Sequence, residues 1–333
     1  MTSRRAAAML AAALIVAVAA PLGAYLKLGT LVGSRTQSLR WREFPVRYFI
    51  NNNGVEQVTP QQFQAAIGRG FSTWRGVETA QTSSEFVGFV NAQPFVADGA
   101  SVIGFQSRPD QDRTLAATTF TVDVTDGHIL ESDIFFNSTF LWSVADGGAA
   151  DRFDVESIAL HEIGHLLGLS HSALGETELV AGGRRVIAAE AAMFPIAFSR
   201  GNIAGRTLKA DDIAGISDIY GTPAFTRDFG SIAGRVTKAG RGVKGAHVVA
   251  FGTRTGKLVA GFTLTEGGDF VIAGLESGTY LLRAEPLDDG DINSFFDTDF
   301  GVDVDFRVAF HDRVVAVPRG GGVRDIEIKV VAK

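Results

Sequence analysis

The stretch HEIGHLLGLSH, residues 161–171, carries the strongest structural signal in the chain. Residues four positions apart share one face of an α-helix, so His161 and His165 can present their imidazoles to one metal ion. Gly168 can adopt a left-handed backbone conformation and end the helix, which lets His171 return to the same ion from outside it. The spacing therefore predicts three histidine ligands on a helix and the turn that follows it.

This pattern is typical of a catalytic zinc site. Three neutral imidazoles leave the fourth position of a tetrahedral zinc ion open for water, whereas a structural site has four protein ligands. Zinc lowers the pKa of such a water to about 7. Glu162 is adjacent to a ligand and can accept the proton of the water and pass it to a leaving amine. A lone HExxH pattern arises by chance, but here three of the six histidines in the chain would have to converge by accident.

Helix signals flank this stretch on both sides. Thr59 is a candidate N-cap, and Pro60 and Gln62 complete the signature of a helix start with a capping box. A second helix is expected from Asp154 to Gly168, and a third from Lys209 to Tyr220. The apolar residues that fall on one face of the first helix are Phe63, Ile67, Phe71 and Trp74.

Strand signals fill the rest of the first two thirds of the sequence. Residues Leu39 to Ile50, LRWREFPVRYFI, are expected to form one strand that ends at the turn of Asn51 to Gly54. Several short β-like runs follow between Glu85 and Asn137, separated by turns such as Asp126-Gly127.

Five segments give the chain a resemblance to the metzincin zinc peptidases, in their matrixin branch. Residues 161–171 match the metzincin signature. Residues 192–195, AMFP, look like the Met-turn, a loop beneath the metal, in its matrixin form. Residues 208–221, LKADDIAGISDIYG, are similar to the closing helix of matrixins. The Trp41 strand and the helix that ends at Trp74 are similar to the first strand and helix of that family.

The resemblance implies an α+β fold for residues 39–222, with a twisted five-stranded sheet, three helices and a cleft between two subdomains. It implies the same three zinc ligands and the same glutamate as the spacing does, and it makes Met193 the floor of the site. It also implies that a substrate peptide lies extended along an edge strand above the zinc helix. A pocket wall is expected in the segment after Met193, from Pro195 to Phe198. The edge strand is placed at Leu115, Ala116, Ala117 and Thr118.

The sequence departs from the matrixin pattern in several places. The segment 176–190, ETELVAGGRRVIAAE, is an insertion that is expected to rim or cover the cleft. The structural zinc of vertebrate matrixins needs several upstream histidines, but only His128 precedes His161, so we expect a single zinc ion. A cysteine switch is excluded because the chain has no cysteine. The carboxylates that form a candidate Ca²⁺ site are Asp123, Asp126, Glu131 and Asp133.

The N-terminal residues 1–24 are predicted to be a signal peptide. Arg4 and Arg5 precede an apolar run from Ala6 to Ala20, which Pro21 ends. This run is short for a membrane-spanning helix, which needs about 20 residues. We expect export with cleavage of this segment, and an uncleaved anchor is the alternative.

Residues 228–333 are predicted to form an all-β sandwich domain. Short strands with glycine-rich turns, such as SIAGRV and AHVVAF, follow one another in this region. The region resembles carboxypeptidase regulatory-like or transthyretin-like sandwiches in its pattern of GRV, GVKGAHVVA and GDFVIAGLESGTY. These residues serve packing and turns, so the resemblance concerns the fold; stabilisation of the first domain and binding of a surface or protein partner are both open.

Composition limits the functions that fit. The chain has 333 residues, which suggests about two domains at a prior of ~150 residues each. The net charge of −6 does not favour a nucleic-acid partner. We therefore expect a secreted zinc endopeptidase with a protein or peptide substrate, and membrane contact only through an uncleaved signal segment. The alternatives are a secreted binding or adhesion protein whose zinc-peptidase fold is non-catalytic or conditionally active, and a peptidase of very narrow range.

Overall fold

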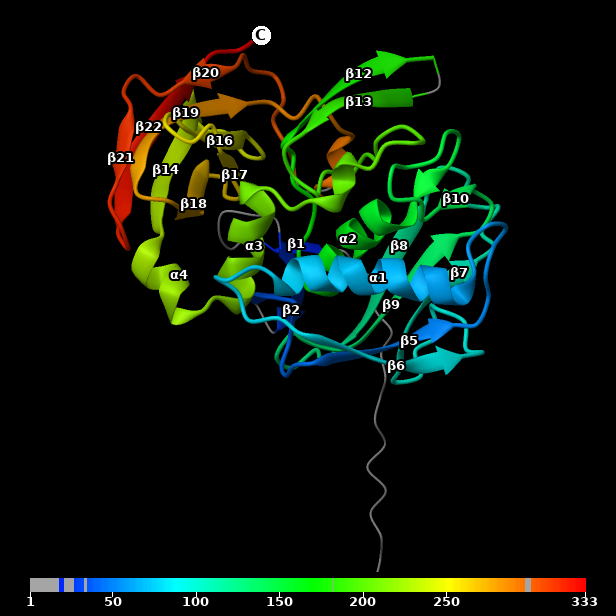
Figure 1. Cartoon of the computed structure of the whole chain (residues 1–333). Helices are drawn as coiled ribbons and strands as arrows, with labels where there is room; N and C mark the ends of the chain where they lie inside the picture. The colour runs from blue at the N-terminus through cyan, green and yellow to red at the C-terminus, as the bar shows by residue number, and fades with distance from the viewer. Residues whose placement is uncertain (1–17, 21–26, 33–34, 182, 297–300) are drawn as a thin grey trace, which may run out of the picture.

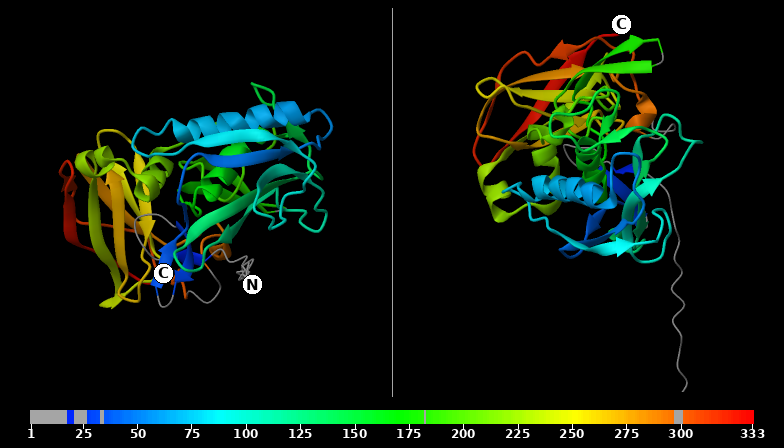
Figure 2. Two further views of the ribbon diagram at one scale, coloured as in Figure 1. Left: turned by 90° about the horizontal axis from the view of Figure 1, so that it is seen from below. Right: turned by 45° about the vertical axis from the view of Figure 1, so that its right-hand side comes forward.

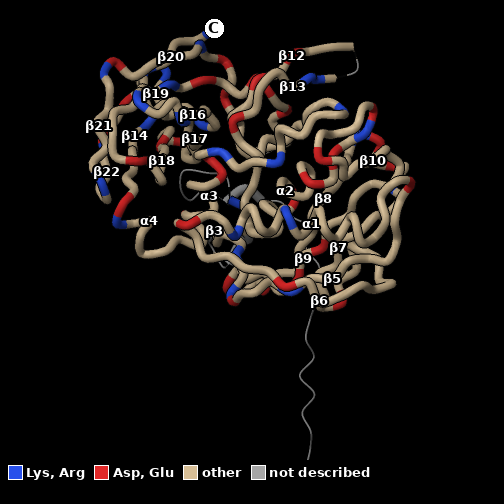
Figure 3. The backbone as a smooth tube through the Cα atoms, viewed as in Figure 1, with Lys and Arg blue, Asp and Glu red and all other residues tan. Residues whose placement is uncertain are grey.

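The computed structural model describes residues 18–20, 27–32, 35–181, 183–296 and 301–333. The chain forms two parts that lie side by side (Figure 1). The first part combines a large sheet with helices, and the second part consists mainly of two smaller sheets. Lysine and arginine are interspersed with aspartate and glutamate over both parts (Figure 3).

The large sheet positions the helices that carry the candidate site. Its strands are β4 (Arg40–Trp41), β5 (Val46–Asn51), β6 (Ser84–Val90), β7 (Ser101–Gln106), β8 (Ala116–Val122) and β9 (His128–Asn137). All neighbouring strands are parallel except β8, which runs antiparallel to β9. β8 pairs with no other described strand, so it forms an edge of the sheet. The two-residue β4 adds a sixth strand to the five that were expected.

The prediction of one strand from Leu39 to Ile50 is wrong, because the structure divides this segment. β4 pairs with β9, whereas β5 lies between β6 and β7. Arg42 to Pro45 form bends between the two strands. Pro45 has no amide hydrogen to donate to a neighbouring strand, which is consistent with a break in the ladder at this point.

Two helices pack against each other and against this sheet (Figures 1 and 2). α1 (Pro60–Arg75) begins with the predicted capping box between Thr59 and Gln62, which is confirmed. The indole nitrogen of Trp74 donates a hydrogen bond to the carbonyl of Leu160 on α2, at 2.9 Å. The predicted apolar face of α1 is buried in the same core as the inner strands, which fixes α2 (Val155–Leu166) over the sheet.

α2 begins and ends where the sequence indicates. The carboxylate of Asp154 accepts a hydrogen bond from the amide of Ser157, as an N-cap does. Arg206 donates two further hydrogen bonds to this carboxylate, at 2.9 and 2.6 Å. Gly168 follows α2 with a φ of +100°, the left-handed conformation that a glycine adopts at low cost.

The remaining elements of the first part surround α2. The insertion after residue 175 forms an antiparallel hairpin. The third predicted helix is confirmed as α3. The elements are β10 (Trp142–Ser143), β11 (Phe153–Asp154), β12 (Gly175–Val180), β13 (Gly183–Ala189), the 3₁₀ helix η1 (Ala204–Arg206), α3 (Ala210–Tyr220) and α4 (Pro223–Asp228).

The second part has two sheets that share one hydrophobic core. One contains β14 (Gly230–Lys238), β15 (Arg241–Gly242), β18 (Asp269–Leu275) and β22 (Gly322–Val330). The other contains β16 (His247–Gly252), β17 (Leu258–Phe262), β19 (Gly278–Glu285), β20 (Ala309–Phe310) and β21 (Val315–Val317). A 3₁₀ helix, η2 (Ile292–Ser294), lies after β19. The relationship to carboxypeptidase regulatory-like domains stays a prediction.

The two parts are joined through α3. Asp211 is buried and accepts a hydrogen bond from the amide of Ala260 on β17, at 2.8 Å. The same carboxylate accepts a hydrogen bond from the hydroxyl of Ser172, at 2.6 Å. Ala214 belongs to the core of the second part, where it lies against Gly274. One helix of the first part therefore contributes to both cores.

Most of the predicted signal segment lies outside the described residues. Its residues 18–20 form β1 (Val18–Ala20), which pairs with β2 (Lys27–Val32), and β2 pairs with β3 (Arg35–Ser38). The amide of Leu28 on β2 donates a hydrogen bond to the carbonyl of Gly168, at 3.0 Å, so β2 lies against the turn after α2. Within the described residues, no helix has the length and apolar character required to span a membrane.

Candidate metal centre

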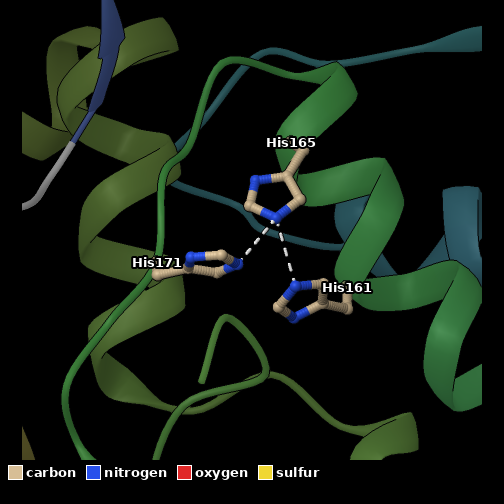
Figure 4. A group of neighbouring side chains, drawn as sticks. All are labelled: His161, His165 and His171. Carbon is tan, nitrogen blue, oxygen red and sulfur yellow. Dashed lines mark hydrogen bonds between the residues drawn. The ribbon is translucent and has the colours of Figure 1, made fainter. Parts of the chain in front are cut away.

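The structure brings together the three histidines that the spacing singled out. His161 and His165 project from one face of α2, and His171 reaches them from the segment after the Gly168 turn (Figure 4). The Nε2 atom of His165 lies 3.1 Å from that of His161 and 3.2 Å from that of His171. Among the described residues, these three form the one group of potential metal ligands whose donor atoms all lie within 4.8 Å of one another.

The opposite nitrogen of each ring fixes its tautomer. Every Nδ1 atom contacts a backbone carbonyl, and because a carbonyl only accepts hydrogen bonds, each Nδ1 must carry the hydrogen. Burial lowers the pKa of all three rings, that of His161 to about 3, so the rings are neutral. The three Nε2 atoms therefore present lone pairs. The carbonyls contacted by His161, His165 and His171 belong to Ala192, Leu169 and Ser294, at 2.8, 2.8 and 2.5 Å.

This donor set fits a zinc ion. Three lone pairs that face one another without a hydrogen between them repel, and a cation removes that repulsion. Tetrahedral zinc with Zn–N bonds of about 2.0–2.1 Å holds its nitrogen ligands roughly 3.3 Å apart, close to the 3.1 and 3.2 Å found here. The backbone carbonyl behind each imidazole is the usual second partner of a zinc-bound histidine.

Glu162 lies on α2 beside the first histidine and faces the same cleft. Its side chain is buried, and burial raises the pKa of its carboxyl group to about 7. The hydroxyl of Thr118 on β8 donates a hydrogen bond to Oε2 of Glu162, at 2.7 Å, and partly opposes this rise in pKa. Thr118 was expected only as part of the substrate strand. Its contact with Glu162 spans 44 residues, and no local motif indicates it.

Met193 contacts α2 at Gly164. A Cβ placed on Gly164 would come within 2.2 Å of its sulfur, so the helix and the Met193 loop are in direct contact at a position that lacks a side chain. The carboxylate of Asp212 accepts hydrogen bonds from the amides of Ala192 and Met193, at 2.8 and 3.1 Å. Asp212 therefore holds this loop in place. The sequence shows Asp212 next to Asp211 at the start of a predicted helix, but it does not indicate the hydrogen bonds with the Met193 loop.

A cleft of about 850 Å³ runs past the histidines. The segment predicted as a substrate edge, Leu115 to Thr118, lines one side of it. The predicted pocket wall, Pro195 to Phe198, also lines it, together with apolar Ile158 of α2. The insertion contributes Leu179 and Arg184 from its hairpin, so it lies at the rim of the cleft.

The structure does not support the candidate calcium site, because among the described residues no three of its four carboxylates present oxygen atoms within 4.8 Å of one another. The carboxylate of Asp133 accepts hydrogen bonds from the amides of Phe95, Val96 and Val102. Asp126 forms an ion pair with Arg42. The other two carboxylates have separate partners: Glu131 accepts from the amide of Gly99, and Asp123 accepts from Thr125. The four carboxylates thus have separate protein partners and do not converge on one cation position.

Comparison with known proteins agrees with this architecture. Residues 40–221, more than half of the chain, match the matrixin family, peptidase M10. The chain is 30% identical over 178 residues to Metalloendoproteinase 1 of Glycine max, covering 48% of this chain and 46% of that protein. It is 25% identical over 198 residues to Metalloendoproteinase 4-MMP of Arabidopsis thaliana, covering 56% and 50%. It is 26% identical over 193 residues to Stromelysin-1 of Mus musculus, covering 57% and 35%.

The fold and the histidine triad define a metzincin-like metallopeptidase domain. The chain belongs to the matrixin family, whose members are zinc-dependent. It spans about half or less of the length of the curated relatives given above.

Proposed function

We propose that this protein is an exported zinc-dependent endopeptidase. The observation that carries the proposal is the convergence of the Nε2 atoms of three neutral, half-buried imidazoles in a cleft that also contains a buried glutamate. The ligand group contains three described residues, whereas a structural zinc ion is held by four protein ligands. When bound, zinc polarises the scissile carbonyl and lowers the pKa of a water molecule.

Glu162 is the residue that moves protons in this proposal. Its carboxylate accepts a proton from the attacking water and then donates it to the leaving amine of the cleaved peptide. Both roles require the carboxyl group to lie in the cleft next to the three histidines, which is where the structure places Glu162. The hydroxyl of Thr118 on β8 orients the carboxylate through its hydrogen bond.

The substrate is proposed to be a polypeptide in an extended conformation. β8 has a free edge among the described strands, and Ala116 to Thr118 at its start line the cleft beside Glu162. An extended peptide can add to such an edge through main-chain hydrogen bonds. The wall formed by Pro195 to Phe198 and Ile158 is apolar, so it suits an apolar side chain next to the cleaved bond.

Export is proposed from the sequence of residues 1–24, with cleavage of this segment. The alternative function, a secreted binding or adhesion protein without turnover, is favoured by one observation, that the hairpin of β12 and β13 lies at the rim of the cleft. The two functions make opposite predictions for cleavage by the zinc-loaded protein.

The test is the substitution Glu162→Ala in the full chain. We expect zinc content to stay at one ion per chain and cleavage of casein or a peptide library to fall about 100-fold or more, since general acid–base catalysis contributes factors of this order. Zinc content is measured by metal analysis, and activity is measured with zinc removed by a chelator and then restored. Glu56→Gln, an exposed position away from the cleft, is the control.

Full activity in Glu162→Ala would refute the proposed mechanism. Absence of cleavage by the zinc-loaded wild-type protein, combined with tight binding of a protein partner, would favour the alternative function.

A further inference from the structure

We propose that residues 288–296, the 288–296 loop of the second part, belong to the active site, where they position His171 and close one side of the substrate cleft. This inference rests on the proposed zinc endopeptidase function. The 288–296 loop follows β19 and contains η2. Nothing in the histidine motif indicates it, because the contact it makes with His171 joins residues 123 positions apart.

The first step is the contact with the third histidine. Nδ1 of His171 donates a hydrogen bond to the carbonyl of Ser294, at 2.5 Å. The other two histidines are held by carbonyls of the first part, those of Ala192 and Leu169. A carbonyl behind a ligating imidazole fixes the ring and its tautomer, and losing such a partner typically lowers metal affinity about 10–100-fold. The second part of the molecule therefore supplies the carbonyl partner of one of the three histidines.

The second step is the anchoring of the loop. Phe295 and Phe296 are buried in a cluster with Phe262 of β17 and with Ala173 of the first part. The ring of Phe295 stands at 80° to that of His171, with the ring centroids 6.4 Å apart. The packing is tight, since a Cβ on Gly290 would lie 2.9 Å from the Phe295 ring. These contacts hold the Ser294 carbonyl in place.

The third step is the link between the loop and the hairpin at the cleft rim. The amide of Thr177 on β12 donates to the carboxylate of Asp289, at 2.7 Å, and its hydroxyl donates to the Asp289 carbonyl, at 2.9 Å. Arg184 on β13 lies 4.0 Å from the carboxylate of Asp291. The arginines of β13 appear in blue in Figure 3. Loop and hairpin thus form one connected wall, and Asp291 and Asn293 line the cleft from it.

The wall is expected to restrict which substrates enter the cleft. An open groove accepts any extended chain that fits its pockets, whereas the wall formed by the loop and the hairpin excludes chains whose side chains would clash with it. We therefore assign to the 288–296 loop a role in specificity as well as in the support of His171. Loosening the loop is expected to weaken zinc binding and to broaden the range of peptides cleaved.

The experiment compares Phe295→Ala with Phe310→Ala in the full chain. Phe310 is 63% exposed on β20, so its removal is the matched control. Zinc dissociation constants are measured by competition with a chromophoric chelator, and folding is monitored by circular dichroism. We expect Phe295→Ala to bind zinc about 10-fold or more weakly and the control to match the wild type. An unchanged dissociation constant in folded Phe295→Ala would overturn the inference.

A second pair covers the case in which Phe295→Ala does not fold. Asp289→Ala removes the carboxylate that accepts from Thr177, and Asp312→Ala, at a side chain that is 77% exposed, is its control. We expect weaker zinc binding and a broader peptide cleavage profile for Asp289→Ala alone, and wild-type values for both readouts would overturn the inference. The zinc measurement needs no turnover, so it decides the role of the loop even where the proposed peptidase activity fails.

Discussion

At the scale of single residues, the cleft contains a contact between Thr118 and Glu162 that the histidine motif does not specify. Glu162 is adjacent to a metal ligand in sequence, but adjacency alone leaves its carboxylate free to rotate. The hydroxyl of Thr118 fixes it with a hydrogen bond of 2.7 Å to Oε2. Thr118 also donates to the backbone carbonyl of Glu162, at 3.1 Å, which ties β8 to α2 at this point. Thr118 is therefore a positioning residue for the proposed general base.

The substitution Thr118→Val tests this role. Hydrogen bonds to charged groups contribute about 1.5–3 kcal/mol, so we expect kcat to fall about tenfold or more while KM changes little. Thr118→Ser keeps the hydroxyl and should restore most of the activity. Steady-state kinetics with one peptide, together with zinc content, checks the prediction. Equal losses in the valine and serine variants would show that the methyl group and packing matter here instead.

At the scale of secondary-structure elements, the end of α2 determines where the third histidine lies. Gly168 has a φ of +100°, and a Cβ at this position would come within 2.4 Å of the carbonyl oxygen of Leu39. The turn is therefore restricted by its backbone conformation and by the neighbouring backbone at Leu39, between β3 and β4. The path of the chain from this turn brings His171 to α2.

Gly168→Ala is expected to destabilise the protein by about 1–3 kcal/mol, the usual cost of a non-glycine residue in a sparsely populated backbone region. Zinc affinity should fall as well, because His171 follows the displaced turn. Urea denaturation and chelator competition measure the two effects. Gly147→Ala is the matched control, since no atom lies within 4 Å of a Cβ placed there. A stable variant with wild-type zinc affinity would contradict the role given to the turn.

At the scale of the whole molecule, the two parts meet at a buried carboxylate. Asp211 on α3 accepts from the Ala260 amide of the second part and from the Ser172 hydroxyl of the first. Ser172 follows His171 directly in the sequence. The junction therefore lies immediately behind the metal centre, where the 288–296 loop also makes its contact with His171. The second part can therefore influence the metal centre through two contacts, that of Ala260 with Asp211 and that of Ser294 with His171.

The ionisation of Asp211 gives this junction a pH dependence. Burial raises the pKa of Asp211 from 3.8 to about 7. The folded state then binds more protons than the unfolded state between these values, so the contribution of Asp211 to stability is full below pH ~4 and is lost as the pH rises through 7. Asp211→Asn cannot ionise and retains an acceptor oxygen. We expect its melting temperature to rise relative to the wild type as the pH increases from 4 to 8.

Thermal unfolding at several pH values, with Asp325→Asn at an exposed site as the control, measures this difference. The pKa shift corresponds to an effect on the order of a few kcal/mol in the free energy of unfolding. A difference between the variant and the wild type that is constant with pH would show that Asp211 does not ionise over this range.

The local part of this molecule followed from the sequence by itself. The capping box at Thr59, the cap at Asp154, the stop at Gly168 and the i, i+4 histidines depend on contacts between residues close in the chain, and helix geometry alone relates them. The single strand predicted for Leu39 to Ile50 failed because strand pairing depends on distant partners. The calcium expectation is not supported, because Asp133 accepts from the amides of Phe95, Val96 and Val102, which lie 31 to 38 positions away in the chain.

Only the tertiary structure decided what surrounds the histidines. The contacts of Thr118 with Glu162, of Asp211 with Ala260 and of Ser294 with His171 join residues 44, 49 and 123 positions apart. No periodicity or motif encodes such pairs, because the packing of separate elements sets which side chains and carbonyls meet. The sequence therefore determined the metal-binding chemistry, and the packing of the two parts determined how that chemistry is oriented and enclosed.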